Sequence, residues 1–448
     1  MTAVHASLLL DLYQLTMGQA YFHLGMKETA VFELFVRRLP ATRRFLLLAG
    51  IAQAMEYLEQ LQFKADELEF LAGLGTFSPA FLDHLASVRF TGSVHAMQEG
   101  TPFFADEPIL RITAPILEAQ LVESRLLNIV HFQTLIASKA ARCVIAAAGR
   151  QLVDFGMRRA HEADAGLYAA RAAYLAGFDA TATVEAGKRF AIPLSGTMAH
   201  SFIEAHDREE DAFRGFVRSQ LGTTALLIDT YNTERAAQRV VELMRELQEQ
   251  GIPRRIRSVR IDSGDLASEA RAVRDILDRN GCHDVQIVLS GSLDEHRIAE
   301  LVHGGAPADA FGVGTALDTS ADAPALDMAY KLQEYTGRPR RKRSPGKATW
   351  PGTKQVFREC GLQGEALGDH VALLGENIPG DPLLVQVMEN GCRLGTPASL
   401  VETRQFCARE LQAFPPGVRE LHEGTAPYPV TISRAVRELA AKLDTETA

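Results

Sequence analysis

The sequence has few cysteines for its length, and no two of them are spaced as a CxxC pair. Its 448 residues include five, Cys143, Cys282, Cys360, Cys392 and Cys407. An odd number of widely separated cysteines indicates neither a disulfide framework nor a zinc cluster. The pattern is typical of a reducing compartment, and we therefore predict a cytoplasmic location.

Positive charge and long hydrophobic runs are also scarce. Lys and Arg number 47 against 56 Asp and Glu, which gives a net charge of −9 and removes the usual electrostatic argument for nucleic acid or an anionic membrane as a partner. The most apolar long segment, residues 126–149, is interrupted by His131, Lys139 and Arg142. No segment approaches the roughly 20 apolar residues that cross a bilayer. We expect neither nucleic acid nor a membrane as a partner.

Short apolar runs alternate with helical spacing in the middle of the chain. Hydrophobic residues make up 46% and charged residues 23%, as in ordinary globular domains, and the length corresponds to two or three domains or to one barrel with an appended domain. Strand–helix alternation implies a parallel sheet. A β/α barrel fits the spacing, and a doubly wound open sheet is the alternative. The predicted strands are 225–229, 258–262, 285–290 and 309–312, and the predicted helices between them are 233–250 and 266–280.

Polar or glycine residues end each of these four strands. In β/α barrels the working residues gather at the carboxyl ends of the strands. Carboxylates there can hold a ribose diol, or Mg²⁺ through water, and the N–H groups of glycine turns bind phosphate oxygens. Together the strand ends predict a site for a phosphorylated sugar, while each Asp alone could equally be a helix N-cap. The strand ends are Asp229–Tyr231, Asp262–Asp265, Ser290–Ser292 and Gly312–Thr315.

Two further segments carry candidate side chains. Arg158 and Arg159 follow a glycine turn and can present a planar fork to a carboxylate or phosphate; two surface ion pairs are the alternative. His200 follows a Gly-Thr turn and is expected in the first turn of a helix. A single histidine is more often structural. It becomes a functional candidate if a carboxylate such as Asp229 orients its second ring nitrogen.

A series of motifs gives the sequence a resemblance to a known family. The motifs run in the family's order over nearly the whole chain, which is more specific than any one of them. The chain resembles nicotinate phosphoribosyltransferase, a type II phosphoribosyltransferase. The motifs are DLYQLTM (11–17), FELFVRRLP (32–40), DFGMRRAH (154–161), SGTMAHSF (195–202), IDTYNT (228–233), VRIDSGDL (259–266), LSGSLDE (289–295), FGVGT (311–315) and GKATWPGTKQVFR (346–358).

This resemblance implies a fold of the α/β class, an irregular β/α barrel with a second, smaller α/β domain formed from both chain ends. Residues 1–125 would form the N-terminal α/β domain, completed by parts of residues 352–448. Residues 126–351 would form the barrel that carries the active site, and the segment 352–448 would pack on both.

The resemblance also implies a reaction, the ATP-coupled transfer of the phosphoribosyl group from phosphoribosyl pyrophosphate to nicotinate. The products would be nicotinate mononucleotide and pyrophosphate, a step of NAD salvage. Mg²⁺ is the implied cofactor, with no direct protein ligand assigned, and ATP is a co-substrate. His200 matches the family histidine that ATP transiently phosphorylates, Asp229 matches its orienting carboxylate, and Asp262 completes the expected catalytic set.

The same match implies the binding roles. Arg260 and Asp262 would lie over the ring and ribose, Arg158 would pair with the nicotinate carboxylate, and Tyr13 would stack on the pyridine ring. Relatives supply this tyrosine from the neighbouring subunit, so a homodimer with the active site at its interface is implied. Gly291, Gly312 and Gly314 would receive the 5′-phosphate, and the other expected substrate contacts are Phe155, Gly196, Thr197, Ser201, Asp265, Ser290 and Thr315.

Several departures and alternatives accompany this prediction. Nicotinamide-using relatives carry an Asp two positions after the glycine that matches Gly196, where this chain has Met198; an Asp there would repel a carboxylate, so its absence favours the acid. The alternatives are a nicotinamide or quinolinate phosphoribosyltransferase and a non-catalytic relative that binds phosphoribosyl pyrophosphate or nucleotide. Ser292 replaces a third glycine of many relatives, and the basic run 338–347 is typical of a solvated loop.

Overall fold

The chain forms two compact units. A computed structural model describes residues 7–252, 256–421 and 427–446. Unit 2 is Lys139–Asp322, and unit 1 combines the chain up to Ser138 with the chain from Ala323 onward. Unit 1 is therefore built from both chain ends, as predicted, but it is the larger unit and not the smaller one.

The unit boundaries lie at 138/139 and 322/323, instead of the predicted 125/126 and 351/352. The reason is local packing. The first half of helix α6 (Glu123–Ala147) contributes Leu126, Val130 and Leu135 to the core of unit 1. Strand β12 (Met328–Tyr335) pairs antiparallel with strand β1 (Thr29–Val36), so the chain has already returned to unit 1 before residue 335.

Unit 2 is built on a six-stranded sheet whose paired strands are all parallel. The strand order is β7-β6-β11-β10-β9-β8, and β7 and β8 are the two edges, so the sheet is a curled half-barrel and not a closed barrel. The predicted strands of the middle of the chain are confirmed. The strands are β6 (Gln151–Asp154), β7 (Ala180–Thr181), β8 (Thr224–Leu227), β9 (Ile256–Ile261), β10 (Gln286–Leu289) and β11 (Ala310–Val313).

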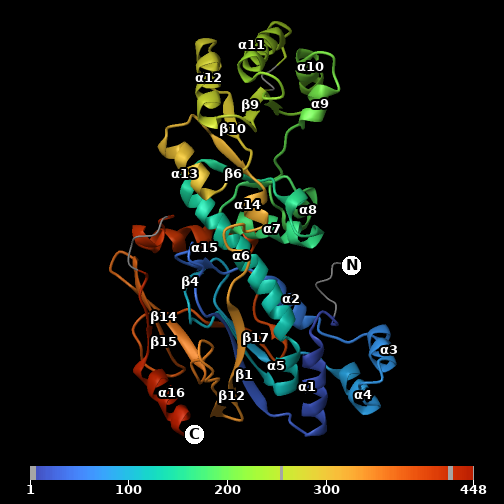
Figure 1. The fold of residues 1–448 in the computed structure, drawn as a ribbon, viewed down its shortest axis with the longest axis vertical. Coiled ribbons are helices and arrows are strands. Elements are labelled where there is room, and N and C mark those ends of the chain that lie inside the picture. The colour runs from blue at the N-terminus through green and yellow to red at the C-terminus, as the bar shows by residue number, and fades with distance from the viewer. Residues whose placement is uncertain (1–6, 253–255, 422–426, 447–448) are drawn as a thin grey trace. The chain divides into compact units, whose positions relative to one another are not determined.

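Amphipathic helices cover one face of this sheet. Helix α11 begins after the N-cap Asn232 and ends before Gly251, whose φ of +70° suits glycine, and it buries Ala237, Val240 and Leu247. Figure 1 shows α11 and α12 beside β9 and β10. The helical elements of unit 2 are the 3₁₀ turn η2 (Met157–Arg159), α7 (Ala163–Ala176), α8 (Val184–Phe190), α9 (His200–Glu204), α10 (Glu209–Ser219), α11 (Thr233–Glu249), α12 (Leu266–Arg279), α13 (Glu295–His303) and α14 (Thr315–Asp318).

The two faces of the unit 2 sheet differ in chemistry. Alternate residues of a strand point to opposite faces. The helix-covered face is apolar, with Val259 and Ile261 on β9 and Ile287 and Leu289 on β10 all buried. The other, inner face carries polar or small side chains at the intervening positions. Those positions are Ser258, Arg260, Gln286, Val288, Ala310 and Gly312, and they lead to Asp262, Ser290 and Gly314 just beyond the strand ends.

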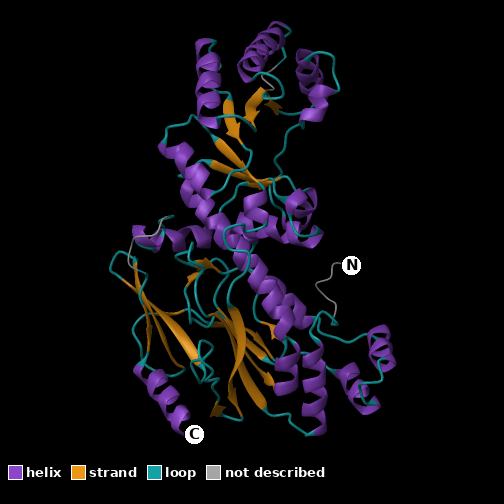
Figure 2. Ribbon diagram, viewed as in Figure 1, coloured by secondary structure: helices purple, strands orange, loops and turns teal. Residues whose placement is uncertain are grey.

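The described residues of unit 1 form three sheets, with helices packed beside them (Figure 2). The largest has seven strands in the order β13-β12-β1-β5-β3-β17-β18, and the others are β16-β14-β15-β19 and β2-β4. Its helices are α1 (Leu12–His23), α2 (Ile51–Glu59), α3 (Ala65–Gly73), α4 (Pro79–Ser87), α5 (Ile116–Leu121), α15 (Leu400–Ala413) and α16 (Arg434–Glu446), with the 3₁₀ turn η3 (Pro416–Val418). Its remaining strands are β2 (Leu46–Leu47), β3 (Ser93–Ala96), β4 (Pro102–Phe103), β5 (Leu110–Pro115), β13 (Arg338–Pro339), β14 (Lys354–Cys360), β15 (Ala366–Leu373), β16 (Asp381–Pro382), β17 (Val385–Glu389), β18 (Cys392–Arg393) and β19 (Val430–Ile432).

Helix α6 is long and apolar enough, by length and composition, to cross a membrane, but 78% of its most apolar window is buried within the protein. Two of its charged side chains, Lys139 and Arg142, are also buried and paired. Lys139 forms an ion pair with Glu295, and Arg142 Nε donates a hydrogen bond to the same carboxylate at 2.8 Å. A mostly buried helix with paired charges is typical of a protein core.

The motif GTKQVFR supplies buried charges to unit 1. Lys354 Nζ lies 2.8 Å from a carboxylate oxygen of Glu33, on the neighbouring sheet. Arg358 donates to both oxygens of Asp369, at 2.9 and 2.6 Å, and burial leaves each of these side chains dependent on its partner. Both cations therefore have structural partners within unit 1.

The basic run 338–347 is exposed over most of its length, as predicted. It begins as β13, which pairs with β12. Two of its side chains bind the last helix: Arg341 Nη1 donates to the Asp444 carboxylate at 2.7 Å, and Arg343 Nη1 donates to the Asp444 carbonyl at 3.0 Å. The run therefore holds α16 in addition to carrying solvated charge.

Candidate functional site

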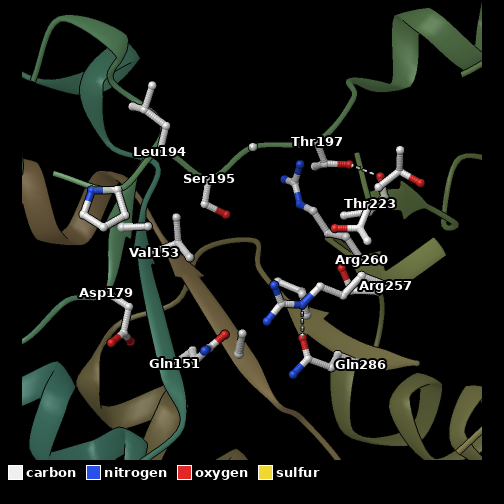
Figure 3. Close-up of a pocket in the computed structure, with 18 of the residues that line it drawn as sticks. Gln151, Val153, Asp179, Leu194, Ser195, Thr197, Thr223, Arg257, Arg260 and Gln286 are labelled. Atoms are coloured by element: carbon white, nitrogen blue, oxygen red, sulfur yellow. Dashed lines mark hydrogen bonds between the residues drawn. The ribbon is translucent and has the colours of Figure 1, made fainter. Parts of the chain in front are cut away.

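The inner face of the unit 2 sheet lines a cavity of about 420 Å³ (Figure 3). Four of the residues that the sequence predicts as site residues line it: Phe155, Gly196, Thr197 and Arg260. The cavity follows the strands from their amino ends to Arg260 near the carboxyl end of β9. A cavity with polar groups over one sheet face is a typical small-molecule site.

The segment Pro193–Thr197 bridges the two edge strands of the half-barrel. On one side, Thr181 N–H in β7 donates to the Pro193 carbonyl and Ser195 N–H donates back to the Thr181 carbonyl, each at 3.0 Å. On the other side, Thr197 Oγ1 donates to the Ala225 carbonyl in β8 at 2.6 Å, the bond drawn in Figure 3. This segment therefore forms the wall of the cavity where the sheet is open.

Arg260, Asp262 and Ser290 form a hydrogen-bonded cluster at the carboxyl ends of β9 and β10. Arg260 donates from Nη2 to Asp262 Oδ1 at 2.6 Å and from Nε to Ser290 Oγ at 2.8 Å, and Ser290 Oγ donates to Asp262 Oδ1 at 2.6 Å. Each side chain of the cluster is held by the other two. Such a network fixes the orientation of the arginine and the carboxylate before any ligand arrives.

The carboxyl group of Asp262 is ionised at neutral pH. Burial alone would raise its pKa, but the hydrogen bond from Ser290 and the charge of Arg260 outweigh burial and hold the pKa below its ordinary value. Because the pKa is lowered, the stabilisation from this cluster is present above the ordinary aspartate pKa of about 4 and is lost as the pH falls below it.

Phe155 packs under Arg260 against a glycine. The Arg260 guanidinium carbon lies 5.3 Å from the centre of the Phe155 ring, a cation–π contact. A Cβ atom at Gly312 would lie 2.4 Å from two atoms of that ring. Gly312, predicted to receive a phosphate, is therefore required by the packing of Phe155, whatever else binds there.

For the phosphoribosyl transfer that the sequence resemblance implies, replacing Gly312 by Ala is expected to lower kcat/KM by about 10²-fold, because the methyl group displaces the Phe155 ring and with it the Arg260 contact. Steady-state kinetics of the purified variant would measure this loss. The matched control is Gly222→Ala, where a Cβ atom meets nothing within 4 Å. Equal kinetics for the two variants would contradict the packing role.

Two further predicted glycine positions lie close to backbone atoms. Gly291 has φ +93°, and a Cβ atom there would lie 1.9 Å from the Asp262 carbonyl oxygen, so only glycine fits this turn. Gly314 is the N-cap of α14, and a Cβ atom there would lie 3.2 Å from the Phe155 carbonyl oxygen. Ser292, the departure from the family pattern, adopts a left-handed φ of +49°, a conformation that glycine adopts more readily.

His200 begins α9 and faces Asp262. Its Nδ1 atom lies 3.0 Å from Thr230 Oγ1, and its Nε2 atom lies 4.0 Å from Asp262 Oδ2. The predicted partner Asp229 is engaged elsewhere: its Oδ2 accepts hydrogen bonds from Asp262 N–H at 2.9 Å and from Ser263 Oγ at 2.6 Å. Asp229 thus holds the turn that carries Asp262, while Thr230 binds the imidazole.

The other predicted residues lie outside this cluster. Arg158, Ser201 and Thr315 are exposed, and the described lining of the cavity does not include them. Asp265 is the N-cap of α12 and accepts from Ala267 N–H and Ser268 Oγ, which is the alternative that the sequence left open. Tyr13 belongs to α1 in unit 1, where burial and the nearby Glu123 raise the pKa of its phenol to about 12.

The cavity also contains polar residues that the sequence prediction did not include. Arg257 and Gln286 lie at the amino ends of β9 and β10, and Arg257 Nε donates to Gln286 Oε1 at 3.3 Å (Figure 3). The polar lining also includes Gln151, Asp179, Ser195, Thr223, Thr224 and Ser258. Period-two alternation would have indicated some of them, since Gln151, Val153 and Phe155 share one face, as do Gln286, Val288 and Ser290.

Fold and site together define an α/β protein whose ligand site occupies the inner face and carboxyl ends of a parallel half-barrel. Three family models match the chain: the nicotinate phosphoribosyltransferase N-terminal domain at residues 8–131, the nicotinate phosphoribosyltransferase family at residues 150–340, and its C-terminal domain at residues 380–440. The chain belongs to the nicotinate phosphoribosyltransferase family.

Individual relatives agree with this assignment. A nicotinate phosphoribosyltransferase of Mycobacterium tuberculosis is 48% identical over 99% of this chain and 95% of its own length, and one of Bacillus subtilis is 41% identical over 83% of this chain and 77% of its own. The crystal structure of human nicotinic acid phosphoribosyltransferase superposes with a TM-score of 0.87 at 28% identity, covering 97% of this chain and 100% of that one.

Proposed function

We propose that the protein transfers the phosphoribosyl group of phosphoribosyl pyrophosphate to nicotinate, coupled to ATP hydrolysis. The observation that carries this proposal is the cluster of Arg260, Asp262, Ser290 and His200 at the strand ends, in a chain of this family. Nicotinate, phosphoribosyl pyrophosphate, ATP and water would give nicotinate mononucleotide, pyrophosphate, ADP and phosphate.

The transfer step requires positioning more than covalent chemistry. The bond between ribose C1 and the pyrophosphate oxygen breaks with its electron pair on pyrophosphate, the sugar becomes cationic, and the ring nitrogen of nicotinate forms the new bond to C1. In the proposed mechanism the Asp262 carboxylate, held by Arg260 and Ser290, stabilises the cationic sugar, and Phe155 with Arg260 borders the ring.

The residues present fit a Mg²⁺ ion. Asp229 Oδ1 is buried without a hydrogen-bond partner among the described residues, and Asp262 Oδ2 accepts none of the bonds that hold Oδ1. One or two carboxylates with substrate phosphates are the usual Mg²⁺ ligands. When bound, the ion would neutralise charge on the leaving pyrophosphate, and Asp229 and Asp262 are the residues that we propose to hold it.

We propose that ATP phosphorylates His200. If Nδ1–H donates to Thr230 Oγ1, then Nε2 carries the lone pair and can attack the γ-phosphorus, forming a P–N bond as the P–O bond to ADP breaks. Asp262, 4.0 Å from Nε2, would stabilise the positive charge that develops on the ring. Later attack by water would release phosphate and restore the imidazole.

Nicotinate, and not its amide, is the proposed substrate. Met198 is buried two residues beyond Gly196, where an Asp would repel the substrate carboxylate.

The family resemblance further suggests a homodimer in which Tyr13 of one copy contributes to the site of the other. Light scattering on the purified protein would give the mass in solution, and a monomer that is fully active would contradict this arrangement.

A product assay tests the proposed function. Purified protein is incubated with phosphoribosyl pyrophosphate, Mg²⁺ and one of nicotinate, nicotinamide or quinolinate, with and without ATP, and the mononucleotides, ADP and pyrophosphate are quantified by chromatography. We expect nicotinate mononucleotide, formed faster with ATP. Comparable use of nicotinamide, preference for quinolinate, or no turnover of any acceptor would each contradict the proposal.

Replacing His200 by Ala is expected to reduce ATP hydrolysis by at least about 10³-fold, because the proposed nucleophile is removed, while weak ATP-independent phosphoribosyl transfer persists. The readouts are ADP release and acid-labile ³²P on the protein. His206→Ala is the matched control, since His206 lies shortly after α9 and its ring contacts the Phe202 carbonyl and ring. Unchanged ATP hydrolysis in the His200 variant would refute the phosphohistidine.

A further inference from the structure

Two buried aspartates, Asp154 and Asp318, contact the same residue, Gly156. Asp154 ends β6 and Asp318 ends α14, and both are buried. Asp154 Oδ1 accepts from Gly156 N–H at 2.8 Å, and its Oδ2 accepts from Thr181 Oγ1 at 2.7 Å. The Asp154 carboxylate is thus already the acceptor of two hydrogen bonds.

Asp318 has no comparable donors. Among the described residues, neither of its buried oxygens accepts a hydrogen bond from an N–H or O–H group. The Asp318 carboxyl packs on Gly156, and the N–H of that same glycine donates to Asp154, so the two carboxyls are neighbours. Two ionised carboxylates in contact repel each other, and a pair of this kind is stable when one of them is protonated. The proton belongs on Asp318, because Asp154 accepts the two other bonds.

The Asp318 carboxyl also touches the turn that follows β6. A Cβ atom at Gly156 would lie 2.1 Å from Asp318 Cγ, so the carboxyl group packs directly on this glycine. The preceding residue, Phe155, carries the ring that lies under Arg260. The contact between Asp318 and Gly156 therefore fixes where the backbone leaves β6 toward the cavity.

We propose that Asp154 and Asp318 share one proton, and that Asp318 acts as a positioning residue that holds the Phe155 turn in its active arrangement. The shared proton is a property of the fold and needs no substrate, whereas the positioning role rests on the proposed function, in which Phe155 borders the substrate.

The pKa values of the two carboxyls are shifted by burial, by the hydrogen bonds to Asp154 and by each other. Burial raises the pKa of Asp154, and burial together with the charge of Asp154 raises the pKa of Asp318 well above its ordinary value. The packed elements η2 and α7 carry the titratable side chains Arg158, Arg159, Asp164, Tyr168, Arg171 and Tyr174, and none of them contributes to either pKa shift. Strands β7 and β11 carry no titratable side chain.

The pH dependence of folding stability follows from the direction in which the pKa of Asp318 is shifted. Because folding raises the pKa of Asp318, its contribution to stability is fully present below the ordinary pKa of about 4 and is lost as the pH rises toward the folded-state pKa. An asparagine at this position keeps the shape, donates an N–H to Asp154 at every pH, and carries no such loss. The variant Asp318→Asn should therefore gain stability relative to the parent protein as the pH rises.

The first experiment compares melting temperatures of the full chain and Asp318→Asn between pH 5 and pH 8. We expect the difference in favour of the variant to grow by about 2–4 °C across this range. Asp275→Asn is the control, because the Asp275 side chain is exposed on α12, where it pairs with Arg279; its difference in melting temperature should not change with pH. A constant difference for Asp318→Asn would refute the shared proton, whatever the enzyme does.

The second experiment tests positioning. We expect Asp318→Ala to raise the KM for nicotinate by about tenfold with a smaller change in kcat, since the Phe155 turn loses its support. Asp318→Asn should restore KM to within about threefold of the parent value and should keep its activity at alkaline pH longer than the parent. Wild-type KM for the folded alanine variant, or failure of asparagine to rescue it, would refute the positioning role.

Discussion

Replacing Asp262 by Asn is expected to reduce kcat/KM for phosphoribosyl transfer by about 10²–10³-fold. The pKa of this carboxyl is lowered, chiefly by the Ser290 hydrogen bond and the Arg260 charge acting against burial, so it is ionised over the whole working range of pH. Asparagine has the same shape but no charge to place beside the cationic sugar or opposite the Nε2 atom of His200. Initial rates of nicotinate mononucleotide formation at varied substrate concentrations would measure the loss.

Asp294→Asn provides the matched control for this experiment. Asp294 is the N-cap of α13 and accepts from Arg297 N–H at 2.8 Å, and asparagine caps a helix about as well as aspartate. We expect its kinetic constants to stay within about threefold of the parent values. If Asp262→Asn behaved in the same way, the carboxylate would have no role in transition-state stabilisation.

Replacing Arg358 by Met is expected to lower the free energy of unfolding by about 3–5 kcal/mol. The substitution keeps an unbranched side chain but leaves Asp369 buried without its bidentate partner. Glu107 lies in the same cluster, where burial and the charge of Asp369 raise its pKa well above its ordinary value, so the loss of the cation leaves two buried acids together. Urea unfolding followed by circular dichroism would measure the change.

An exposed arginine supplies the comparison. Arg434→Met removes an ion pair with Glu438 one turn along α16, and the Arg434 side chain is 88% exposed. Exposed pairs of this kind contribute about 0–1 kcal/mol. Equal losses for the two variants would show that burial of the Arg358 pair adds nothing to stability.

The strands and helices of unit 2 were predictable because their side chains repeat with clear periods. Helix α11 shows apolar residues at helical spacing up to Gly251, and the structure places it at Thr233–Glu249. The unit boundaries were not predictable in the same way. Helix α6 continues unbroken through residue 138, so the sequence has no turn signal where the core of unit 1 ends.

The strand-end residues were predicted as a group, and the structure brings Arg260, Asp262 and Ser290 into direct contact. Their individual partners could not be predicted. Which side chain binds His200 Nδ1 depends on the backbone path after β8, which presents Thr230 to the ring and turns Asp229 toward Asp262. The distances that decide this lie between segments about 30 residues apart in sequence, and a single sequence carries no direct signal for them.

The neighbours of the glycines that follow strands could not be predicted from the sequence either. A glycine after a strand indicates that a side chain is not tolerated there, but it does not identify what occupies the space. At Gly312 the occupant is the ring of Phe155, and at Gly156 it is the carboxyl group of Asp318. Both neighbours come from other segments of the chain. The phosphate predicted to bind at Gly312 can therefore contact this glycine only on the side that the Phe155 ring does not occupy.

The bridge that Pro193–Thr197 forms between β7 and β8 has a consequence for solubility. Unpaired strand edges are templates for association between molecules. Here the outer edge of β7 is hydrogen-bonded to Pro193 and Ser195, and β8 receives a bond from Thr197. The same short segment leads into His200, so the residues that shield the sheet from other copies of the chain also set the position of the imidazole. Disrupting the hydrogen bonds of this segment would therefore both expose an unpaired strand edge and displace His200.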